Sequence, residues 1–545
     1  MTPLALTLTR LNPLPSIVLG FTCLVGFATS ATAAPPQDVG IHVGIVQRFG
    51  DRQKDTLTLK ANPGDRLTLR FDTNGKPETL NTSELKLETA TQRFAQPVVE
   101  ERVVFSTHRS FETAEDQAQA WKAQGIEVEI AQPERWQVWA KRDVYNTPLL
   151  RRLLIKSLQA KGIQTARIES KVVQEVPRPT WVLNGFRYTR DHVDISSGSG
   201  VIQVDRENDD APNRPYGGTL QIQPNAYGNY SLVNFVGIET YLRGVVPHEI
   251  GTWAPQPVLE AQAILARTYA LRNVRRFAID NYQICATTQC QVYRGLDGAE
   301  ASTDRAIAAT RGLVLTYQNE LVDAVYSSTS GGVTSSFNDI WHGWDRPYLR
   351  AVIDSANPVW DLRSRRLSDE GNFRAFINQK KGFNEDGTDM FRWRYEVPIA
   401  TLNQELHDYL KAVRHPMANF KTIQNIQVIQ RSDSGRILKS AIVTDTGTIE
   451  LEKDDIQTVF DAPASTLFYV DAMVEKNKTL KGFIFTGGGF GHGVGMSQYG
   501  SYNLGKLGWS SDRILSFYFP GTQLQPISNS IVLWKDRSNE QASTR

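Results

Sequence analysis

Short runs of alternating apolar and polar residues fill two stretches of this chain and constrain its fold more than any other feature. IHVGIVQRF (41–49) and DTLTLKANPGDRLTLRF (55–71) form the first stretch. The second begins near Pro177 and contains VLNGFRYTRDHVDISS, GVIQVDR, GGTLQIQPN and YSLVNFVGIETYL. A period of two residues, with Gly, Asn and Pro between the runs, predicts strands joined by turns. Both stretches are therefore expected to be rich in β-structure.

Residues 101–168 lie between these stretches and repeat one pattern twice. Each half reads as a strand, a helix, a glycine and a second strand, with Gly125 and Gly162 where a helix C′ glycine belongs. Two such units predict a small ferredoxin-like βαβ-βαβ module over residues 100–170. The pattern resembles the sporulation-related repeat domain that binds septal peptidoglycan. A structural spacer is the alternative interpretation.

The N-terminus has the features of an export signal. Arg10 precedes an apolar run over 17–28, and Ala31-Thr32-Ala33 provides a site for cleavage by a signal peptidase. The run is short for a permanent transmembrane helix. We expect a cleaved signal peptide over residues 1–33 and a location in the periplasm, cell wall or extracellular space. The alternatives are a short membrane anchor and a lipoprotein at Cys23, but Thr22 is a poor match for the latter.

Removal of this segment leaves two cysteines, Cys285 and Cys290. Outside the cytosol such a pair is most simply a local disulfide, which would stabilise the fold by about 2 kcal/mol. A zinc site is the alternative, but it needs further ligands, and no histidine lies nearby in the sequence. No metal or cofactor is expected. Lys and Arg total 60 against 58 for Asp and Glu, a balance that argues against a nucleic-acid-binding protein.

APQPVLEAQAILARTYALRNVRRFAI, from Ala254, predicts a helix with Pro257 in its first turn. At 100° per residue, Arg267 falls in the middle of an apolar stripe. A guanidinium buried there needs a carboxylate partner or a polar cleft. Three other arginines project away from the stripe and are expected on a solvated face: Arg272, Arg275 and Arg276.

Three ordered blocks of sequence resemble the stage II sporulation protein D family, which also includes the amidase enhancers. The first block is YLRGVVPHEI (241–250) followed by LEAQAILARTYAL (259–271). The second is YSSTSGGVTSSFNDIW (326–341) with RPYLRAV (346–352). The third is GGGFGHGVGMSQYGSYNLGKLGWSSDRILSFYFPGT (487–522). The resemblance covers roughly residues 178–525.

This resemblance implies a peptidoglycan lytic transglycosylase, acting by preference on glycan strands stripped of stem peptides. Such an enzyme cleaves the MurNAc–GlcNAc bond and leaves a 1,6-anhydro-MurNAc end. The catalytic Glu of the family corresponds to Glu249, and the Arg of its ARTYA motif to Arg267. Tyr348 matches the Tyr of the PYL motif. Arg350 stands where members often have Lys, which changes the donor geometry.

The residues around Glu249 fit such chemistry. One carboxyl group suffices because the 6-hydroxyl of the sugar replaces water as the nucleophile, whereas a glycoside hydrolase needs two carboxylates. The acid must be protonated near neutral pH, and Val245, Val246, Pro247 and Trp253 would raise its pKa by desolvation. A direct pair with Arg267 would lower that pKa. We therefore expect Arg267 to contact substrate or another carboxylate, such as Glu239 or Asp339.

The glycine-rich blocks add candidate sugar-binding residues: Ser328, His492, Ser497 and Gln498. The glycines predict tight turns beside a cleft, and the polar side chains either bind glycan or hold these loops. No GK[ST] follows GGGFGHG, which argues against a phosphate loop. No Asp completes a catalytic triad with His492 and Ser497.

The predicted fold is α+β, with a strand-rich catalytic domain that contains a long central helix. We divide the chain into a signal peptide (1–33), an N-terminal β-rich segment (38–99), the repeat module (100–170), the catalytic domain (178–525) and a polar tail (526–545). Two other functions remain open. One is a non-catalytic enhancer of an N-acetylmuramoyl-L-alanine amidase, and the other is a structural peptidoglycan-binding protein.

Overall fold

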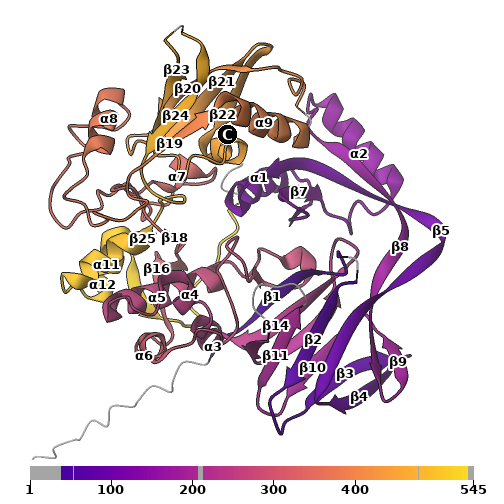
Figure 1. Ribbon diagram of the computed structural model, residues 1–545. Helices are drawn as coiled ribbons and strands as arrows, with labels where there is room; N and C mark the ends of the chain where they lie inside the picture. The colour runs from indigo at the N-terminus through magenta and orange to yellow at the C-terminus, as the bar shows by residue number, and fades with distance from the viewer. Residues whose placement is uncertain (1–37, 53, 207–212, 414, 477, 538–545) are drawn as a thin grey trace, which may run out of the picture. The chain divides into compact units, whose positions relative to one another are not determined.

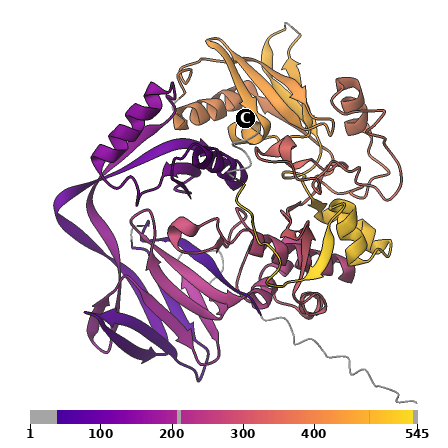
Figure 2. The same ribbon diagram turned by 180° about the vertical axis from the view of Figure 1, so that it is seen from behind.

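Strands from two distant parts of the sequence share the same sheets. The computed structural model describes residues 38–52, 54–206, 213–413, 415–476 and 478–537, so the predicted signal peptide lies outside the described residues. A seven-stranded sheet has the order β15 (Ile284–Cys285), β1 (Gly40–Phe49), β14 (Tyr230–Gly237), β13 (Thr219–Pro224), β10 (Val193–Ser197), β3 (Leu67–Thr73) and β4 (Lys76–Thr82). Figure 1 shows the indigo N-terminal strands beside the magenta strands, and Figure 2 shows the same arrangement from behind.

The second large sheet has eight strands. Its order is β12 (Arg214–Gly217), β11 (Val201–Arg206), β2 (Thr56–Ala61), β5 (Glu84–His108), β7 (Trp136–Ala140) and β6 (Val128–Ala131), and β8 (Arg167–Leu183) pairs with both β5 and β9 (Phe186–Thr189). Leu57 and Leu87 from this sheet and Leu69 and Ile195 from the first are fully buried in one core. The N-terminal β-rich segment is thus continuous with the strands that follow residue 178.

The repeated pattern of residues 101–168 folds as predicted at the level of its elements. Helix α1 (Phe111–Ala123) follows β5, and α2 (Pro148–Ala160) follows β7. The local strand order is β8-β5-β7-β6, with each neighbouring pair antiparallel. Gly125 and Gly162 have φ of 76° and 83°, which confirms their positions just after the two helices.

Helix α5 (Gln256–Arg272) is enclosed on all sides, and almost every residue from Val258 onward is buried. The elements packed around it are α3 (Ile238–Arg243), α4 (Val246–Ile250), α6 (Ala301–Ala309), α11 (Gln498–Lys506), α12 (Ser511–Tyr518) and β16 (Leu313–Tyr317). Figure 1 shows most of these helices gathered around α5.

The prediction that Arg272, Arg275 and Arg276 are solvated was wrong, both for Arg272 at the end of α5 and for the other two in the turn after it. Arg272 is 1% exposed and Arg276 is 4% exposed. Arg272 forms ion pairs with Glu320 and Asp323, Arg275 with Glu115, and Arg276 with Glu112. The periodicity of a helix identifies its apolar stripe but not what covers the opposite face, and here α1 and the segment around Asp323 cover it.

The C-terminal half adds two small sheets and a further core. Their orders are β19 (Trp393–Pro398), β24 (Leu480–Gly487), β23 (Phe468–Val474), and β20 (Ile423–Arg431), β21 (Ile437–Thr444), β22 (Gly447–Glu452). Helix α9 (Ile399–Ala412) covers this core with Leu402, Leu406 and Leu410. The segment predicted as a polar tail begins beside β26 (Gln523–Pro526), which pairs with β16, and its Ile531 is buried.

Asp323 provides a test of the buried ion pairs around α5. It accepts hydrogen bonds from Arg272, Arg346 and the Tyr348 hydroxyl. Burial alone would raise the pKa of Asp323, but Arg272 and Arg346 hold it far below its usual value. Asp323→Asn should lower the free energy of unfolding at pH 7 by about 3–5 kcal/mol, because it leaves buried guanidinium charge without this partner.

Urea unfolding measures this loss, and Asp345→Asn at an exposed position is the control. Asp323 stabilises the folded protein at pH values above its unfolded-state pKa, because its pKa is lower in the folded state. The difference in unfolding free energy between wild type and Asp323→Asn should therefore narrow as the pH falls below about 4. A loss of less than 1 kcal/mol at pH 7 would contradict the prediction.

Candidate functional site

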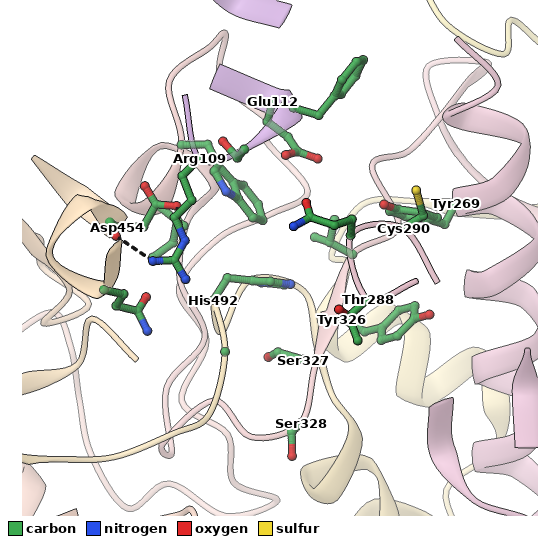
Figure 3. A pocket seen from close by; sticks show the side chains of 18 of the residues that line it. Arg109, Glu112, Tyr269, Thr288, Cys290, Tyr326, Ser327, Ser328, Asp454 and His492 are labelled. Atoms are coloured by element: carbon green, nitrogen blue, oxygen red, sulfur yellow. Dashed lines mark hydrogen bonds and ion pairs between the residues drawn. The ribbon is translucent and has the colours of Figure 1, made fainter. Parts of the chain in front are cut away.

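A cleft of about 500 Å³ contains Glu249 and is built from distant segments of the chain. Arg109 to Glu112 and Trp136 form one part of its wall, from α1 and β7. Asp454 and Gln457 contribute from η2 (Lys453–Asp455) and α10 (Ile456–Val459). Figure 3 shows Arg109, Glu112, Asp454 and His492 around this space, with Tyr326, Ser327 and Ser328 below.

Glu249 lies on α4, a single turn that its flanking residues define. Pro247 occupies the first turn, and Gly251 ends the helix with φ of +77°, a conformation that suits glycine. His248 turns elsewhere, because its Nε2 lies 2.8 Å from the Asp297 carbonyl oxygen. The short helix thus separates the two neighbouring polar side chains and directs Glu249 to the cleft.

The environment of Glu249 favours a protonated carboxyl group near neutral pH. Burial raises the pKa of Glu249 to about 7, while the Val292 N–H and the Tyr326 hydroxyl act in the opposite direction by hydrogen bonding. The Val292 nitrogen lies 2.6 Å from Oε1. Trp253, expected to desolvate this carboxyl group, is 65% exposed and does not line the cleft, so that expectation was wrong.

A chain of side-chain hydrogen bonds fixes the Tyr326 hydroxyl beside Glu249. The Tyr241 hydroxyl donates to Gln291 Oε1 at 3.1 Å, and Gln291 Nε2 donates to the Tyr326 oxygen at 3.0 Å. Because the oxygen of Tyr326 accepts from Gln291, its own proton can point to Glu249. Sequence reasoning missed Tyr326 and Gln291, although Tyr326 opens the YSSTSGG block.

Arg267 pairs with Glu239, one of the two carboxylates proposed for it. Arg267 is fully buried, with Nε and Nη2 2.9 and 2.7 Å from the two Glu239 oxygens. Its Nη1 donates to the Leu313 carbonyl at 3.0 Å. The expected partner is confirmed, but a substrate contact is not, because the paired guanidinium does not line the cleft.

Two more predicted substrate-binding residues lie outside the cleft. Tyr348 is 2% exposed, and its hydroxyl bonds Asp323 in the network beneath α5. Arg350 is exposed and is absent from the lining of the cleft. The prediction that these two residues bind substrate therefore needs correction. Tyr348 is buried and bonded to Asp323, and Arg350 faces solvent outside the cleft.

Ser328, His492 and Gln498 line the cleft as predicted. Gln498 Nε2 donates to the Glu249 carbonyl at 2.8 Å, so it supports the backbone of the carboxyl-bearing turn. The ring of His492 packs against Trp341 with centroids 4.9 Å apart and a tilt of 53°, and its Nδ1 accepts a hydrogen bond from the Val494 N–H. Burial and the nearby Arg436 lower the pKa of His492 to about 4, which keeps the ring neutral at physiological pH.

Ser497 does not reach the cleft; it binds the buried carboxylate of Glu385 at 2.5 Å. The same carboxylate accepts hydrogen bonds from the Ser330 hydroxyl and from the backbone N–H groups of Ser330, Gly331 and Gly332. Glu385 therefore joins the STSGG turn to the GMSQ segment, where β18 (Tyr326–Ser327) pairs in parallel with β25 (Met496–Ser497). Sequence reasoning missed Glu385, because no local pattern marks it.

The predicted disulfide is present between Cys285 and Cys290. Its loop places Thr288 and Gln289 in the cleft wall, just before Val292, the donor to Glu249. Within the described ranges, no group of three or more His, Cys, Asp or Glu side chains is arranged to hold a metal ion. A search of the same residues finds no helix long and apolar enough to cross a membrane.

Replacing Glu385 should show how much of the site depends on this carboxylate. Glu385→Gln places an amide NH₂ against N–H donors that need an acceptor, and should cost about 2–4 kcal/mol of unfolding free energy. Denaturant unfolding measures this cost, with Glu100→Gln on an exposed strand position as the control. Equal stability of the two variants would show that the STSGG turn does not need Glu385.

Two regions of the chain match known protein families. Residues 226–317 match the family model of the stage II sporulation protein, and residues 335–495 match a domain of unknown function (DUF8618). The chain is 26% identical over 404 residues to the amidase enhancer of Bacillus subtilis (strain 168), a match that covers 66% of this chain and 53% of that protein.

A second relative is the stage II sporulation protein D of the same organism, 28% identical over 314 residues, with 54% of this chain and 76% of that protein covered. The chain thus spans about half the length of the amidase enhancer and three quarters of the sporulation protein. The blocks around Glu249 and Arg267 fall within the matched family model. The chain thus has a stage II sporulation protein domain over residues 226–317 and is similar over more than half of its length to an amidase enhancer and to a stage II sporulation protein D.

Proposed function

We propose that this protein is an exported lytic transglycosylase that cleaves the MurNAc–GlcNAc bond of peptidoglycan strands stripped of stem peptides. The observation that carries this proposal is the state of Glu249, a cleft carboxyl group whose pKa is raised to about 7 by burial. Such a group is protonated often enough at neutral pH to act as an acid and basic enough to act afterwards as a base.

In the proposed reaction Glu249 serves in both steps. Its proton passes to the glycosidic oxygen as the bond to the anomeric carbon of MurNAc breaks. The resulting carboxylate takes the proton of the 6-hydroxyl as that oxygen closes on the anomeric carbon, which forms the 1,6-anhydro ring. The Val292 N–H and Tyr326 hydroxyl stabilise the carboxylate between these steps.

Of the other carboxyl groups of the cleft, one is closely paired with an arginine and one has only a distant arginine. Glu112 pairs with Arg276, and Asp454 lies 3.9 Å from Arg109. Arg267 is held away from Glu249 by its bidentate pair with Glu239. Its positive charge is therefore neutralised by a different carboxylate, so burial can govern the pKa of Glu249. The close pairing of Glu112 and the separation of Arg267 from Glu249 support an acid/base role for Glu249.

A second candidate is enhancement of an N-acetylmuramoyl-L-alanine amidase. The similarity to a protein named amidase enhancer, over 66% of this chain, favours it. Purified protein alone, incubated with peptide-stripped glycan and followed by mass spectrometry, separates the two functions. If the purified protein alone releases anhydro products, cleavage is supported. If products appear only when an amidase is added, and are the products of that amidase, enhancement is supported. A purely structural peptidoglycan-binding protein would give neither.

The location and modular organisation belong to the same proposal. Residues 1–33 direct export, and the Cys285–Cys290 disulfide is compatible with an oxidising compartment. We assign residues 100–170 as a ferredoxin-like glycan-binding module, which the strand order β8-β5-β7-β6 with helices α1 and α2 supports.

Glu249→Gln should abolish release of anhydro-muropeptides, with kcat at least about 100- to 10,000-fold lower, because the amide can neither donate nor accept the required proton. Product release from peptide-stripped glycan is measured by mass spectrometry. A thermal unfolding transition like that of wild type confirms the fold of the variant. Release at the wild-type rate would refute the assignment of Glu249.

Tyr326→Phe should move the pH dependence in a defined direction. Removing the hydroxyl removes a hydrogen bond that lowers the pKa of Glu249, so that pKa rises. The acid form persists to higher pH, and the alkaline limb of kcat/KM should shift upward from about 7. We also expect kcat to fall about two- to tenfold, since the carboxylate loses a donor.

Tyr395→Phe, away from the cleft, is the control for this profile. A shift of the alkaline limb to lower pH, or an identical profile for both variants, would contradict the role given to Tyr326. His492 cannot produce this limb, because its pKa is lowered to about 4.

A further inference from the structure

The cleft continues into a second hollow on the side of the repeat module. This hollow has a volume of about 220 Å³, and it shares Arg109, Trp136, Gln289 and Gln457 with the cleft that contains Glu249. The two hollows adjoin each other, because they share these four lining residues, and together we call them the groove. A groove that extends beyond the catalytic carboxyl group suits a polymer whose successive sugars occupy successive positions.

Close contacts attach the module to the turn that follows α5, so the module side of the groove is fixed. Arg276 pairs with Glu112 of α1, and Arg275 bonds Glu115 at 2.5 and 2.7 Å. Trp136 packs against Phe277 with ring centroids 5.2 Å apart. These contacts place Arg109, which immediately precedes α1 and its N-cap Ser110, at the junction of the two hollows.

Arg109 retains donors for an incoming anion. Its side chain is 41% exposed. Both of its hydrogen bonds leave from Nη1, to the Asp454 carbonyl at 3.3 Å and the Thr458 hydroxyl at 3.2 Å. Among the described residues none accepts a hydrogen bond from its Nη2. The Asp454 carboxylate is only a weak partner at 3.9 Å, and burial raises the pKa of Asp454 to about 7, although Arg109 opposes this.

Arg109 differs in this respect from the other cation that lines the Glu249 cleft. Arg276 is 4% exposed and is bound to Glu112, Asn273 and the Gln289 carbonyl. It is therefore a support for the wall rather than a ligand for substrate. In the second hollow Arg135 lies beside Glu134 and does not reach the cleft that contains Glu249.

The chemistry of the proposed substrate contains one group that suits such a donor. The 3-O-lactyl substituent of MurNAc ends in a carboxylate when the stem peptide has been removed, and in a neutral amide when it is present. A guanidinium binds a carboxylate through paired, charge-assisted hydrogen bonds and gains much less from an amide.

We propose that Arg109, contributed by the repeat module, binds the free lactyl carboxylate of a MurNAc residue in the groove and so selects peptide-stripped glycan. This inference rests on the proposed function and identifies the residue that would determine its substrate preference. It also gives the module a role in the same groove as Glu249, in addition to any separate attachment to the cell wall.

Binding measurements test this proposal independently of cleavage. The full chain with Glu249→Gln is titrated by calorimetry with peptide-stripped glycan oligosaccharides, and with the same oligosaccharides after conversion of each lactyl carboxyl group to its methylamide. The parent should bind the carboxylate form about tenfold more tightly. Adding Arg109→Gln should remove this preference and leave binding of the methylamide unchanged, which also shows that the variant is folded.

Arg187→Gln, at an exposed position on β9, is the matched control and should keep the preference. Preference for the carboxylate that survives Arg109→Gln, equal binding of both glycans by the parent, or tighter binding of peptide-bearing strands would each overturn the proposal. Failure of the proposed function gives a different result, in which the protein with Glu249 releases no anhydro product although the Arg109-dependent preference is present.

Discussion

The carboxylate of Glu385 connects the two loops that shape the floor of the cleft. The STSGG turn exposes consecutive backbone N–H groups that no regular secondary structure can satisfy, and Gly331 and Gly332 adopt φ of 74° and 86° there. One buried carboxylate accepts from these groups and from Ser497 across the β18–β25 pair. Since Tyr326 and Gln498 flank this junction and both contact Glu249, the geometry of the acid depends on Glu385.

The pKa of Glu249 is determined more by burial than by any nearby cation. The buried Arg267 is neutralised by Glu239, and Arg272 by Glu320 and Asp323. Next to Glu385, burial raises the pKa of Asp354 well above its usual value, and the neighbouring Glu385 acts in the same direction. Burial raises the pKa of Glu249, and its hydrogen-bond donors Val292 and Tyr326, which lower that pKa, carry no charge.

Local patterns predicted the features that local chemistry determines. Alternation located the strands, the C′ glycines lie where expected, and the close pair Cys285 and Cys290 is bonded. The helix with Pro257 in its first turn is present, but it ends at Arg272 rather than near Ile279. Patterns failed where distant segments meet. The sequence predicted a solvated Arg276, because its partner Glu112 lies 164 positions away. It predicted a substrate-binding Tyr348, because the motif carries no information about the Asp323 network. Motif resemblance identifies residues that a fold needs, without separating those that touch substrate from those that support them.

The region matched to a domain of unknown function contributes directly to the site. Glu385, Asp454 and His492 all lie within residues 335–495. Glu385 holds the STSGG turn, while Asp454 and His492 line the cleft. Arg436, from the same region, donates through Nη2 to the carbonyls of Ser330 and Val333 and so grips the other side of the turn. The matched stage II sporulation region supplies Glu249. Other lining residues of the cleft and the Glu385 carboxylate lie outside that region, so neither matched region alone contains a complete cleft.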